Sequence, residues 1–321
     1  MSNRINIINQ KKLLMKVILI TLISLVLFCK SMYASTKVHK DVPVPLYGIT
    51  VDDSWTGPEK LLQVVDAIKA MPVKPTVRIV MSNKIQPKDY VIIFKTIHEV
   101  AYVMGQPVDS YYMNRYKTIE EYLNRFRDSY QYLSNYVDIW EIANEINGEG
   151  WIGDDRQFNS DKMYAAYKYI KENNAKTAVI SYEVAPGDQE MSMLEWLKVY
   201  VPSDMKVGLD YLLVSYYEDD HHGFQPEWQK VFNELQIIFP NTKVGMGECG
   251  NTAKDATNGS KIKMVNHYYT MPKYVKNYVG GYFWWTWVQD CVPHKGNNIW
   301  KTINDGMMVE KKNFDGSTLM Q

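Results

Sequence analysis

The amino-acid sequence predicts an α/β protein built as a single (β/α)8 TIM barrel. From residue 46 onward, short apolar or β-branched runs alternate with longer stretches of helical periodicity, which is typical of strand–helix units around a parallel sheet. Eight such runs occur, and eight is the number of strands that closes this barrel. No Gly/Ser-rich linker divides the chain, so we expect the units to form one domain.

The predicted strands are short runs rich in apolar and β-branched residues. They are residues 46–52, 76–82, 100–105, 137–143, 177–182, 211–216, 243–248 and 280–286. The helices predicted between them are residues 58–70, 87–98, 118–134, 158–173, 190–200, 226–238 and 259–277. A doubly wound open sheet is the alternative, and it is weaker because no G-x-G-x-x-G motif follows the first strand.

The last strand–helix unit is irregular in sequence. A long loop follows the eighth strand, and Asp305-Gly306 has the composition of a turn where a final helix would otherwise pack. We therefore expect either a short substitute helix over residues 296–304 or a barrel that lacks its last helix.

Composition and charge narrow the classes of partner. The chain has 321 residues, of which 46% are hydrophobic, enough for one large core and unlike a disordered or collagenous sequence. Its 36 Lys and Arg residues balance 36 Asp and Glu residues, with no basic run beyond the extreme N-terminus. This neutrality removes the electrostatic footprint that binding to a phosphate backbone requires, so we expect no nucleic-acid partner.

The N-terminal segment has the pattern of a secretory signal. Lysines precede a strongly hydrophobic run over residues 17–28, and small residues near Ala34 suit cleavage. We predict a signal peptide over residues 1–35, or an uncleaved N-terminal anchor, followed by the barrel domain over residues 36–321. The protein is then exported, to the periplasm or the medium, and meets a membrane only through this segment if at all.

Two cysteines lie in the barrel domain, Cys249 and Cys291. An exported chain meets an oxidising compartment, where such a pair can form a disulfide. Both follow neighbouring predicted strands, which makes pairing plausible. Two ordinary buried thiols are the alternative, and the sequence leaves both open.

Two glutamates end predicted strands. In a barrel of this kind the active site is assembled at the C-terminal ends of the strands, so ionisable residues there are the first candidates. Glu145 ends the segment around strand four, and Glu248 ends strand seven. These strands lie on roughly opposite sides of the barrel mouth, so two carboxyls can face each other across a bound substrate.

The motifs that contain these glutamates resemble those of clan A glycoside hydrolases, which include cellulase, mannanase and xylosidase families. The resemblance rests on Asn144-Glu145 within Trp-Glu-Ile-x-Asn-Glu, on Glu248 in a Gly-rich setting, and on a Trp-rich strand eight. It implies that Glu145 is the general acid/base and Glu248 the nucleophile of a retaining hydrolase of β-linked poly- or oligosaccharides, with no metal or cofactor. Retention requires carboxyls about 5–5.5 Å apart. The family within the clan stays open, because strand three lacks a histidine that some families carry.

The resemblance also implies roles for four supporting residues. Arg78 on strand two matches an arginine beneath the nucleophile, and Asn144 matches the amide that binds the sugar 2-hydroxyl. Tyr216, which we prefer to Tyr217, matches an aromatic hydroxyl that orients the nucleophile. Trp285 matches the tryptophan that forms the floor of the sugar site.

Other polar and aromatic residues near the barrel mouth are candidates by position. Asp52 ends strand one and could bind a distal sugar, and Trp151 lies in a mouth loop as a stacking platform. Glu141 is a fallback carboxylate deeper in the barrel. Residues 218–222, Glu-Asp-Asp-His-His, have metal-ligand types without a spacing that fixes a coordination geometry, so we predict a solvated loop and no metal site.

Two rival functions use the same residues. A carbohydrate-binding barrel that has lost hydrolysis is one, although the presence of both glutamates argues against it. A transglycosylase, in which a sugar replaces water as the acceptor, is the other. The predicted partner in every case is a carbohydrate, and we expect the protein to be a monomer.

Overall fold

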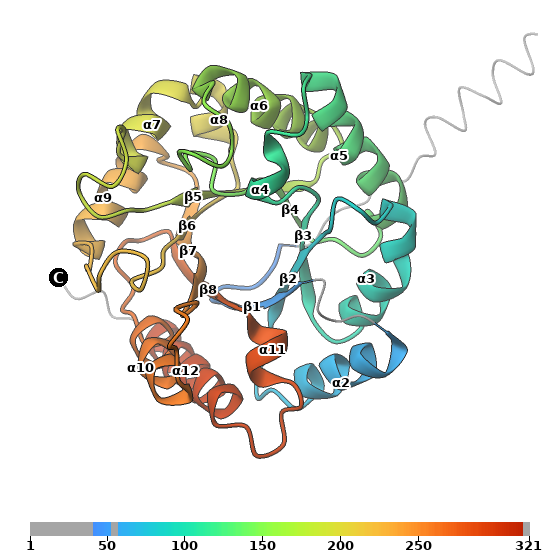
Figure 1. Cartoon of the computed structure of the whole chain (residues 1–321), viewed down its shortest axis with the longest axis vertical. Helices are drawn as coiled ribbons and strands as arrows, with labels where there is room; N and C mark the ends of the chain where they lie inside the picture. The colour runs from blue at the N-terminus through green and yellow to red at the C-terminus, as the bar shows by residue number, and fades with distance from the viewer. Residues whose placement is uncertain (1–40, 53–56, 317–321) are drawn as a thin grey trace, which may run out of the picture. The chain divides into compact units, whose positions relative to one another are not determined.

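Eight parallel strands close into a barrel in their order along the chain, which confirms the predicted fold class (Figure 1). The strands are β1 (Leu46–Val51), β2 (Thr76–Val80), β3 (Tyr102–Gln106), β4 (Ile139–Ala143), β5 (Lys176–Tyr182), β6 (Tyr211–Ser215), β7 (Lys243–Gly250) and β8 (Tyr278–Trp285). The computed structural model describes residues 41–52 and 57–316, and these belong to one compact unit that spans Lys40–Gln321. The predicted signal peptide lies outside the described residues.

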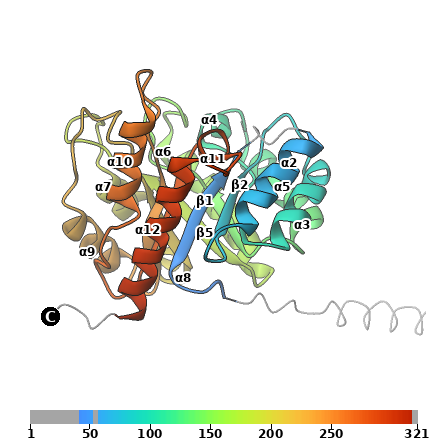
Figure 2. The ribbon, with the colours of Figure 1, turned by 90° about the horizontal axis from the view of Figure 1, so that it is seen from below.

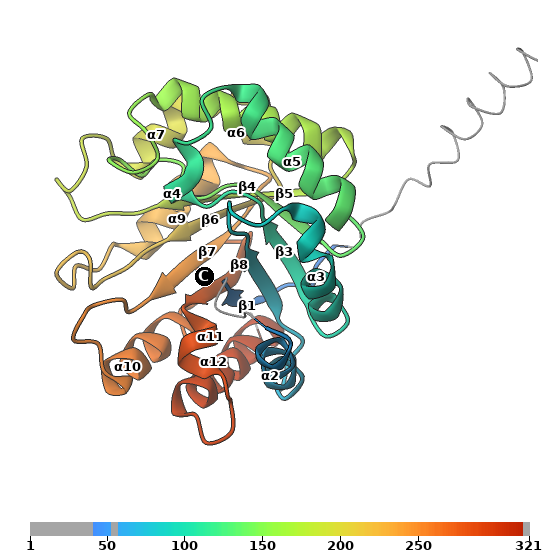
Figure 3. The same ribbon diagram turned by 45° about the vertical axis from the view of Figure 1, so that its right-hand side comes forward.

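Helices surround the barrel on its outer side (Figure 3). They are α2 (Pro58–Lys69), the 3₁₀ helix η2 (Pro87–Tyr90), α3 (Val91–His98), α4 (Ser110–Met113), α5 (Ile119–Leu133), α6 (Arg156–Glu172), α7 (Met193–Tyr200), α8 (Ser203–Gly208), α9 (Trp228–Ile238), α10 (Asn258–Tyr268), α11 (Trp287–Cys291) and α12 (Asn298–Asp315). Helices α4, α8 and α11 were not predicted, because four to six residues carry too little periodicity to detect. Within residues 41–52 and 57–316, no helix is both long and apolar enough to cross a bilayer.

Side-chain caps determine where several of these helices begin. At the start of α5, the Thr118 hydroxyl accepts from the Glu121 backbone N–H at 3.1 Å, and the Glu121 carboxylate accepts from the Thr118 backbone N–H at 3.2 Å. This capping box satisfies two backbone donors that the first helical turn leaves unpaired.

The predicted helix over residues 259–277 is too long, since α10 ends at Tyr268.

The last strand–helix unit is complete, which corrects the expectation of a short or missing helix. Helix α12 has 18 residues and lies in the outer ring between α10 and α2 (Figures 1 and 2). Asn297 caps its start by accepting from the Trp300 backbone N–H at 2.9 Å. Gly306 does not end a turn but lies inside the helix, where a Cβ would stand 2.6 Å from Cβ of Tyr269. The glycine therefore permits close packing on the residue that follows α10.

The barrel interior is layered. A buried apolar cluster draws side chains from β1, β3, β4, β5, β6 and β8, and residues from six different strands can meet only inside the barrel. Ile139 on β4 belongs to this cluster, and Glu141 lies two residues further along the same face. A polar layer that contains Glu141 and Arg78, both fully buried, thus lies above the apolar one, toward the C-terminal ends of the strands.

The strands approach each other unusually closely where the barrel closes. A Cβ on Gly48 of β1 would stand 2.3 Å from the carbonyl oxygen of Gly281 on β8, so only glycine fits there.

The two cysteines of the barrel domain, Cys249 and Cys291, are both buried and both unpaired. Cys249 instead donates its thiol hydrogen to the Tyr282 carbonyl oxygen at 3.0 Å, so the disulfide that the sequence made plausible does not form.

Candidate active site

A cavity of about 400 Å³ opens at the C-terminal ends of the strands, and both Glu145 and Glu248 line it. Its wall is built from residues of the loop after β3, of the ends of β4 to β8, and of the loops that follow them. The other residues that line it are Asp109, Ser110, Tyr111, Asn144, Trp151, Tyr182, Tyr217, Asp220, Thr252 and Trp285.

Glu145 is a buried carboxyl held by two neutral donors. It lies two residues after β4 with a positive φ of 45°, a backbone conformation that residues other than glycine rarely adopt. Ser110 donates to its Oε2 at 2.9 Å, and Ser215 donates to its Oε1 at 2.8 Å. Burial, together with the nearby charge of Glu248, raises the pKa of Glu145 to about 8, although the serine hydrogen bonds oppose the shift. Glu145 therefore carries a proton at neutral pH.

Glu248 has the opposite surroundings. Arg78 donates through Nη1 to Oε2 of Glu248, and Tyr217 donates through its hydroxyl to Oε1 at 2.6 Å. One of these donors is a fixed cation, so the pair stabilises negative charge on this carboxyl. The two glutamates of one cavity thus differ in the charge state that their partners favour.

Arg78 connects the polar layer to the cavity. Its Nε and Nη2 atoms donate to the two oxygens of Glu141 at 2.7 and 2.9 Å. Burial alone would lower the pKa of Arg78, but the charges of Glu141 and Glu248 outweigh it and raise that pKa. Glu141, the fallback carboxylate, is bound on both oxygens by this guanidinium and does not line the cavity.

Asn144 is oriented by the same arginine. Arg78 Nη2 donates to Asn144 Oδ1 at 3.0 Å, so the amide group turns its nitrogen the other way. Asn144 lines the cavity, and within the described part of the chain no hydrogen bond from its Nδ2 is present. The side chain thus offers two N–H donors to a ligand.

The structure places Tyr217, not the preferred Tyr216, against Glu248. Strand β6 ends at Ser215, whose hydroxyl reaches Glu145 inside the barrel mouth. Because successive side chains alternate, Tyr216 then points outward, where its ring stacks on His221 with centroids 5.4 Å apart and its hydroxyl donates to the Phe224 carbonyl oxygen. The sequence-based choice of Tyr216 was therefore off by one residue, because it placed the inward-facing positions of β6 one residue too early.

Aromatic side chains form much of the cavity wall. Trp285, at the end of β8, lines this cavity and also a neighbouring one of about 240 Å³. Trp151 stands edge-on to Tyr182 with ring centroids 5.3 Å apart, and lies nearly parallel to Tyr111 at 6.3 Å. Asp52 lines the neighbouring cavity and not this one, and it accepts from Gln289 Nε2 at 2.8 Å.

Several residues of the site were not predicted from the sequence. Tyr182, which lines the cavity, ends β5, and Ser215, which donates to Glu145, ends β6, so the rule that sites form at strand ends could have found both. Ser110 and Tyr111 belong to the short helix α4, which lies at the mouth end of the barrel (Figure 2). They follow the end of β3 by a few residues, so the sequence places them near the barrel mouth, but no motif indicates that they reach the site.

The acidic loop over residues 218–222 is solvated in part, as predicted, because Asp220 and His222 are exposed, but two of its side chains are bonded within the protein. Asp219 accepts from the backbone N–H groups of Thr252 and Ala253 at 2.8 and 2.9 Å, which ties this loop to the one after β7. His221 is buried, and its ring contacts Asp188 and Tyr182. Within the described residues, no group of three or more His, Cys, Asp or Glu side chains is arranged to hold a metal ion.

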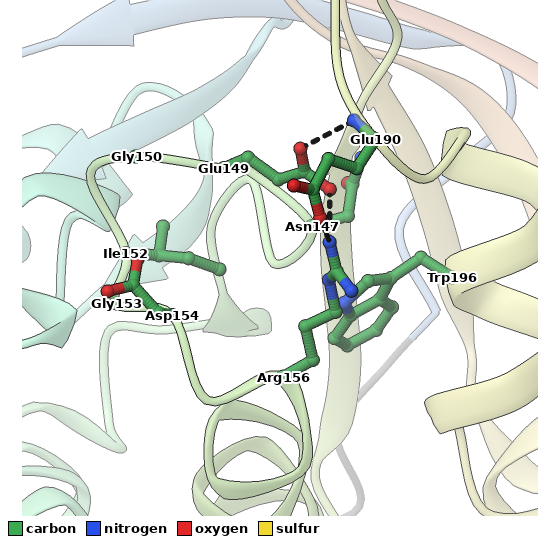
Figure 4. Close-up of a pocket in the computed structure, with 10 residues that line it drawn as sticks. Asn147, Glu149, Gly150, Ile152, Gly153, Asp154, Arg156, Glu190 and Trp196 are labelled. Atoms are coloured by element: carbon green, nitrogen blue, oxygen red, sulfur yellow. Dashed lines mark hydrogen bonds and ion pairs between the residues drawn. The ribbon is translucent and has the colours of Figure 1, made fainter.

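A second cavity, of about 350 Å³, lies behind the loop that follows β4 (Figure 4). Arg156 is its cation, and Glu149 and Glu190 accept from Nη2 of this arginine at 2.8 and 2.9 Å. The same loop carries Asn147, whose side chain exchanges two hydrogen bonds with the Tyr182 backbone, each 2.7 Å long. The loop that lines this second cavity thus also holds Tyr182 in the wall of the first cavity.

No protein-family model and no curated protein sequence matches this chain. Solved structures of Gas2p from Saccharomyces cerevisiae do resemble it. A complex of Gas2p with laminaripentaose has a TM-score of 0.57 and 15% identity over 87% of this chain and 66% of that one. A complex with a compound numbered 11 has a TM-score of 0.57 and 15% identity over 83% of this chain and 65% of that one.

A third Gas2p structure, with laminaritriose and laminaritetraose, has a TM-score of 0.55 and 14% identity over 86% of this chain. This chain spans about two thirds of the length of the Gas2p chains. At such low identity the likeness establishes the (β/α)8 fold, independently of the strand order described above.

Proposed function

We propose that this protein is a retaining glycoside hydrolase that cleaves β-linked glycans by double displacement. The observation that carries the proposal is the contrast between the two glutamates of one cavity. Glu145 is held by neutral serines with its pKa raised to about 8, whereas Glu248 is held by Arg78 and a tyrosine hydroxyl. A protonated and an ionised carboxyl in one site are the acid and the nucleophile that this chemistry needs.

In the first step, a Glu248 oxygen attacks the anomeric carbon while the bond from that carbon to the leaving oxygen breaks. The proton of Glu145 passes to the leaving oxygen. Glu248 is then an ester without charge, so one of the causes that raise the pKa of Glu145 disappears. In the second step Glu145 takes a proton from water, whose oxygen attacks the anomeric carbon and releases Glu248.

The remaining lining residues suit a sugar. Asn144 offers donors to a hydroxyl beside the anomeric carbon, and Trp285 and Trp151 offer flat apolar faces. Gas2p structures hold laminari-oligosaccharides, which are β-1,3-linked glucose oligomers, so β-1,3-glucan is the first substrate to test. The proposed leader, residues 1–35, would deliver the enzyme to glycans outside the cytoplasm.

The experiment is a screen of the purified protein against laminaripentaose, β-glucans, mannans, xylans and exopolysaccharides. Glu145→Gln and Glu248→Gln should each lower turnover by at least about 100-fold, the usual range for loss of a positioned acid or base. Glu190→Gln is the matched control, because Glu190 lies at the second cavity and is exposed. Undiminished activity in either of the first two variants would contradict the proposal.

The products distinguish the rival functions. Shortened oligosaccharides indicate hydrolysis, whereas products longer than the substrate indicate that a sugar hydroxyl intercepts the same intermediate. Binding of a glycan without any product would instead favour the carbohydrate-binding barrel.

A further inference from the structure

The acidic loop after β6 contributes a histidine that the proposed chemistry does not use. His221 has only 6% of its surface exposed, and its ring lies between a loop carboxylate and a cavity tyrosine. Its Nδ1 lies 2.5 Å from Oδ2 of Asp188, and its Nε2 lies 3.2 Å from the hydroxyl oxygen of Tyr182. The three side chains form one hydrogen-bonded chain from the protein surface to the cavity.

We propose that Tyr182 is a substrate-positioning residue, whose hydroxyl accepts a hydrogen bond from a sugar hydroxyl on the leaving-group side of the cavity and is oriented for this by His221 and Asp188. The inference deepens the proposed function and rests on it. It assigns a role to a wall residue and to a loop for which the two-glutamate mechanism has no use.

The proposed hydrogen-bond polarity is that of a neutral imidazole ring at His221. An ionised Asp188 can only accept, so His221 Nδ1 carries the hydrogen of that contact. In the neutral ring, Nε2 is then an acceptor, and the Tyr182 hydroxyl must donate to it. Its hydrogen is thereby committed away from the cavity, and the lone pairs of its oxygen are left to accept from a ligand.

The position of Tyr182 is fixed on three sides, as a positioning role requires. Asn147 exchanges two hydrogen bonds with its backbone, which ties the end of β5 to the loop after β4. Trp151 packs edge-on against its ring at 5.3 Å. The hydroxyl is held by His221, which itself stacks on Tyr216. A group held this firmly loses little freedom when a ligand binds.

The leaving-group side is assigned from the neighbourhood of Glu145. Glu145 follows β4 and Tyr182 ends β5, the strand that pairs with β4, and both residues line the same cavity. Since Glu145 is the proposed proton donor to the leaving oxygen, the sugar attached to that oxygen is the one next to Tyr182. Trp285 and the neighbouring cavity lie at the end of β8, on the other side.

The test compares two substrates in the full-length protein. Laminaripentaose has a sugar as its leaving group, whereas 4-nitrophenyl β-glucoside has a ring without hydroxyls there. Tyr182→Phe should lower kcat/KM for laminaripentaose by about 3- to 10-fold, the loss expected for one hydrogen bond between neutral groups. It should change kcat/KM for the aryl glucoside by less than about twofold, because that substrate makes no such bond.

Variants of the supporting residues separate orientation from folding. Asp188→Leu removes the acceptor that fixes the histidine hydrogen, so it should reduce activity on laminaripentaose selectively, and by more than Asp188→Asn, which retains an acceptor oxygen. Asp188 is 42% exposed, so neither change disturbs the core. Tyr164→Phe is the control, because its hydroxyl also donates to a carboxylate, Asp204 at 2.7 Å, but on the outside of α6.

The remaining outcomes would contradict either the role of Tyr182 or the proposed function. Equal losses on both substrates, or no loss on either, would overturn the role of Tyr182. Failure of the unmodified protein to bind laminaripentaose would overturn the inference as well. If the unmodified protein binds laminaripentaose by calorimetry without cleaving it, the proposed function alone fails, and unchanged affinity in Tyr182→Phe would then overturn the inference separately.

Discussion

The hydroxyl of Tyr217 donates to Oε1 of Glu248 at 2.6 Å, and this contact depends on where β6 ends. The neighbouring Tyr216 carries the same functional group but points to the outside of the barrel, where it bonds the Phe224 carbonyl oxygen. Two adjacent tyrosines thus have opposite surroundings, and they provide an internal comparison.

Replacing Tyr217 by Phe should lower kcat by roughly 10- to 100-fold, because hydrogen bonds to charged groups contribute about 1.5–3 kcal/mol. Tyr216→Phe should lower it by less than about threefold, since the bond it loses is between neutral groups and lies outside the cavity. Steady-state kinetics on one substrate measures both. Equal effects of the two substitutions would show that the contact with Glu248 does not orient a nucleophile.

Arg78 should be essential to stability as well as to activity. Arg78→Met leaves Glu141 and Glu248 without their shared cation in a fully buried layer, so the free energy of unfolding should fall by about 3–5 kcal/mol. Arg156→Met, which breaks two ion pairs at a partly exposed site, should cost about 1 kcal/mol or less. Denaturant titration gives both values, and a similar cost for the two variants would contradict this account.

The activity on oligosaccharides should fall as the pH rises through about 8, because Glu145 must carry its proton to protonate the leaving oxygen. The alkaline limb should be absent with a 2,4-dinitrophenyl glycoside, whose leaving group needs no proton. The measurement is kcat/KM against pH for the two substrates. A shared alkaline limb would mean that some group other than the acid titrates there.

Glu310 on α12 should make the protein less stable as the pH rises. Its carboxyl is buried with no hydrogen-bond partner among the described residues, and burial raises its pKa well above the ordinary value of 4.5. Below the ordinary pKa of 4.5, the Glu310 carboxyl is protonated in both the folded and the unfolded chain. Above it the unfolded chain ionises first, which stabilises the unfolded state by about 1.4 kcal/mol for each pH unit until the folded carboxyl also ionises.

Glu310→Gln removes this titration. The free energy of unfolding should therefore fall less between mildly acidic and mildly alkaline pH in the variant than in the unmodified protein. Guanidinium unfolding of both proteins at the two pH values gives the comparison. An identical pH dependence would show that Glu310 is ionised, or is protonated equally, in both states.

The sequence was informative where a local pattern has one structural outcome. Eight apolar runs at regular spacing predict the strands, and the ends of strands four and seven place Glu145 and Glu248 in one cavity of the structure. Their catalytic roles stay predictions until the variants are measured. Arg78 could be located because a charged residue inside an apolar strand requires partners within the barrel.

Other features depend on relations that no local pattern contains. The choice between Tyr216 and Tyr217 needs the last residue of β6 to be known, and strand ends are uncertain by one or two residues in a sequence. Gly306 has turn composition but serves close helix packing against Tyr269, a contact distant along the chain. Ser110 reaches Glu145 from the short helix α4, whose position follows only from the assembled barrel.

The covalent intermediate tests the central proposal most directly. The protein would be incubated with a 2-deoxy-2-fluoro β-glycosyl fluoride, which slows release of a glycosyl-enzyme, and its peptides weighed by mass spectrometry. We expect the mass of one glycosyl group on the peptide that contains Glu248, and no label in Glu248→Gln. Label on Glu145 or Glu141, or turnover of an ordinary substrate with inversion at the anomeric carbon, would contradict the assignment.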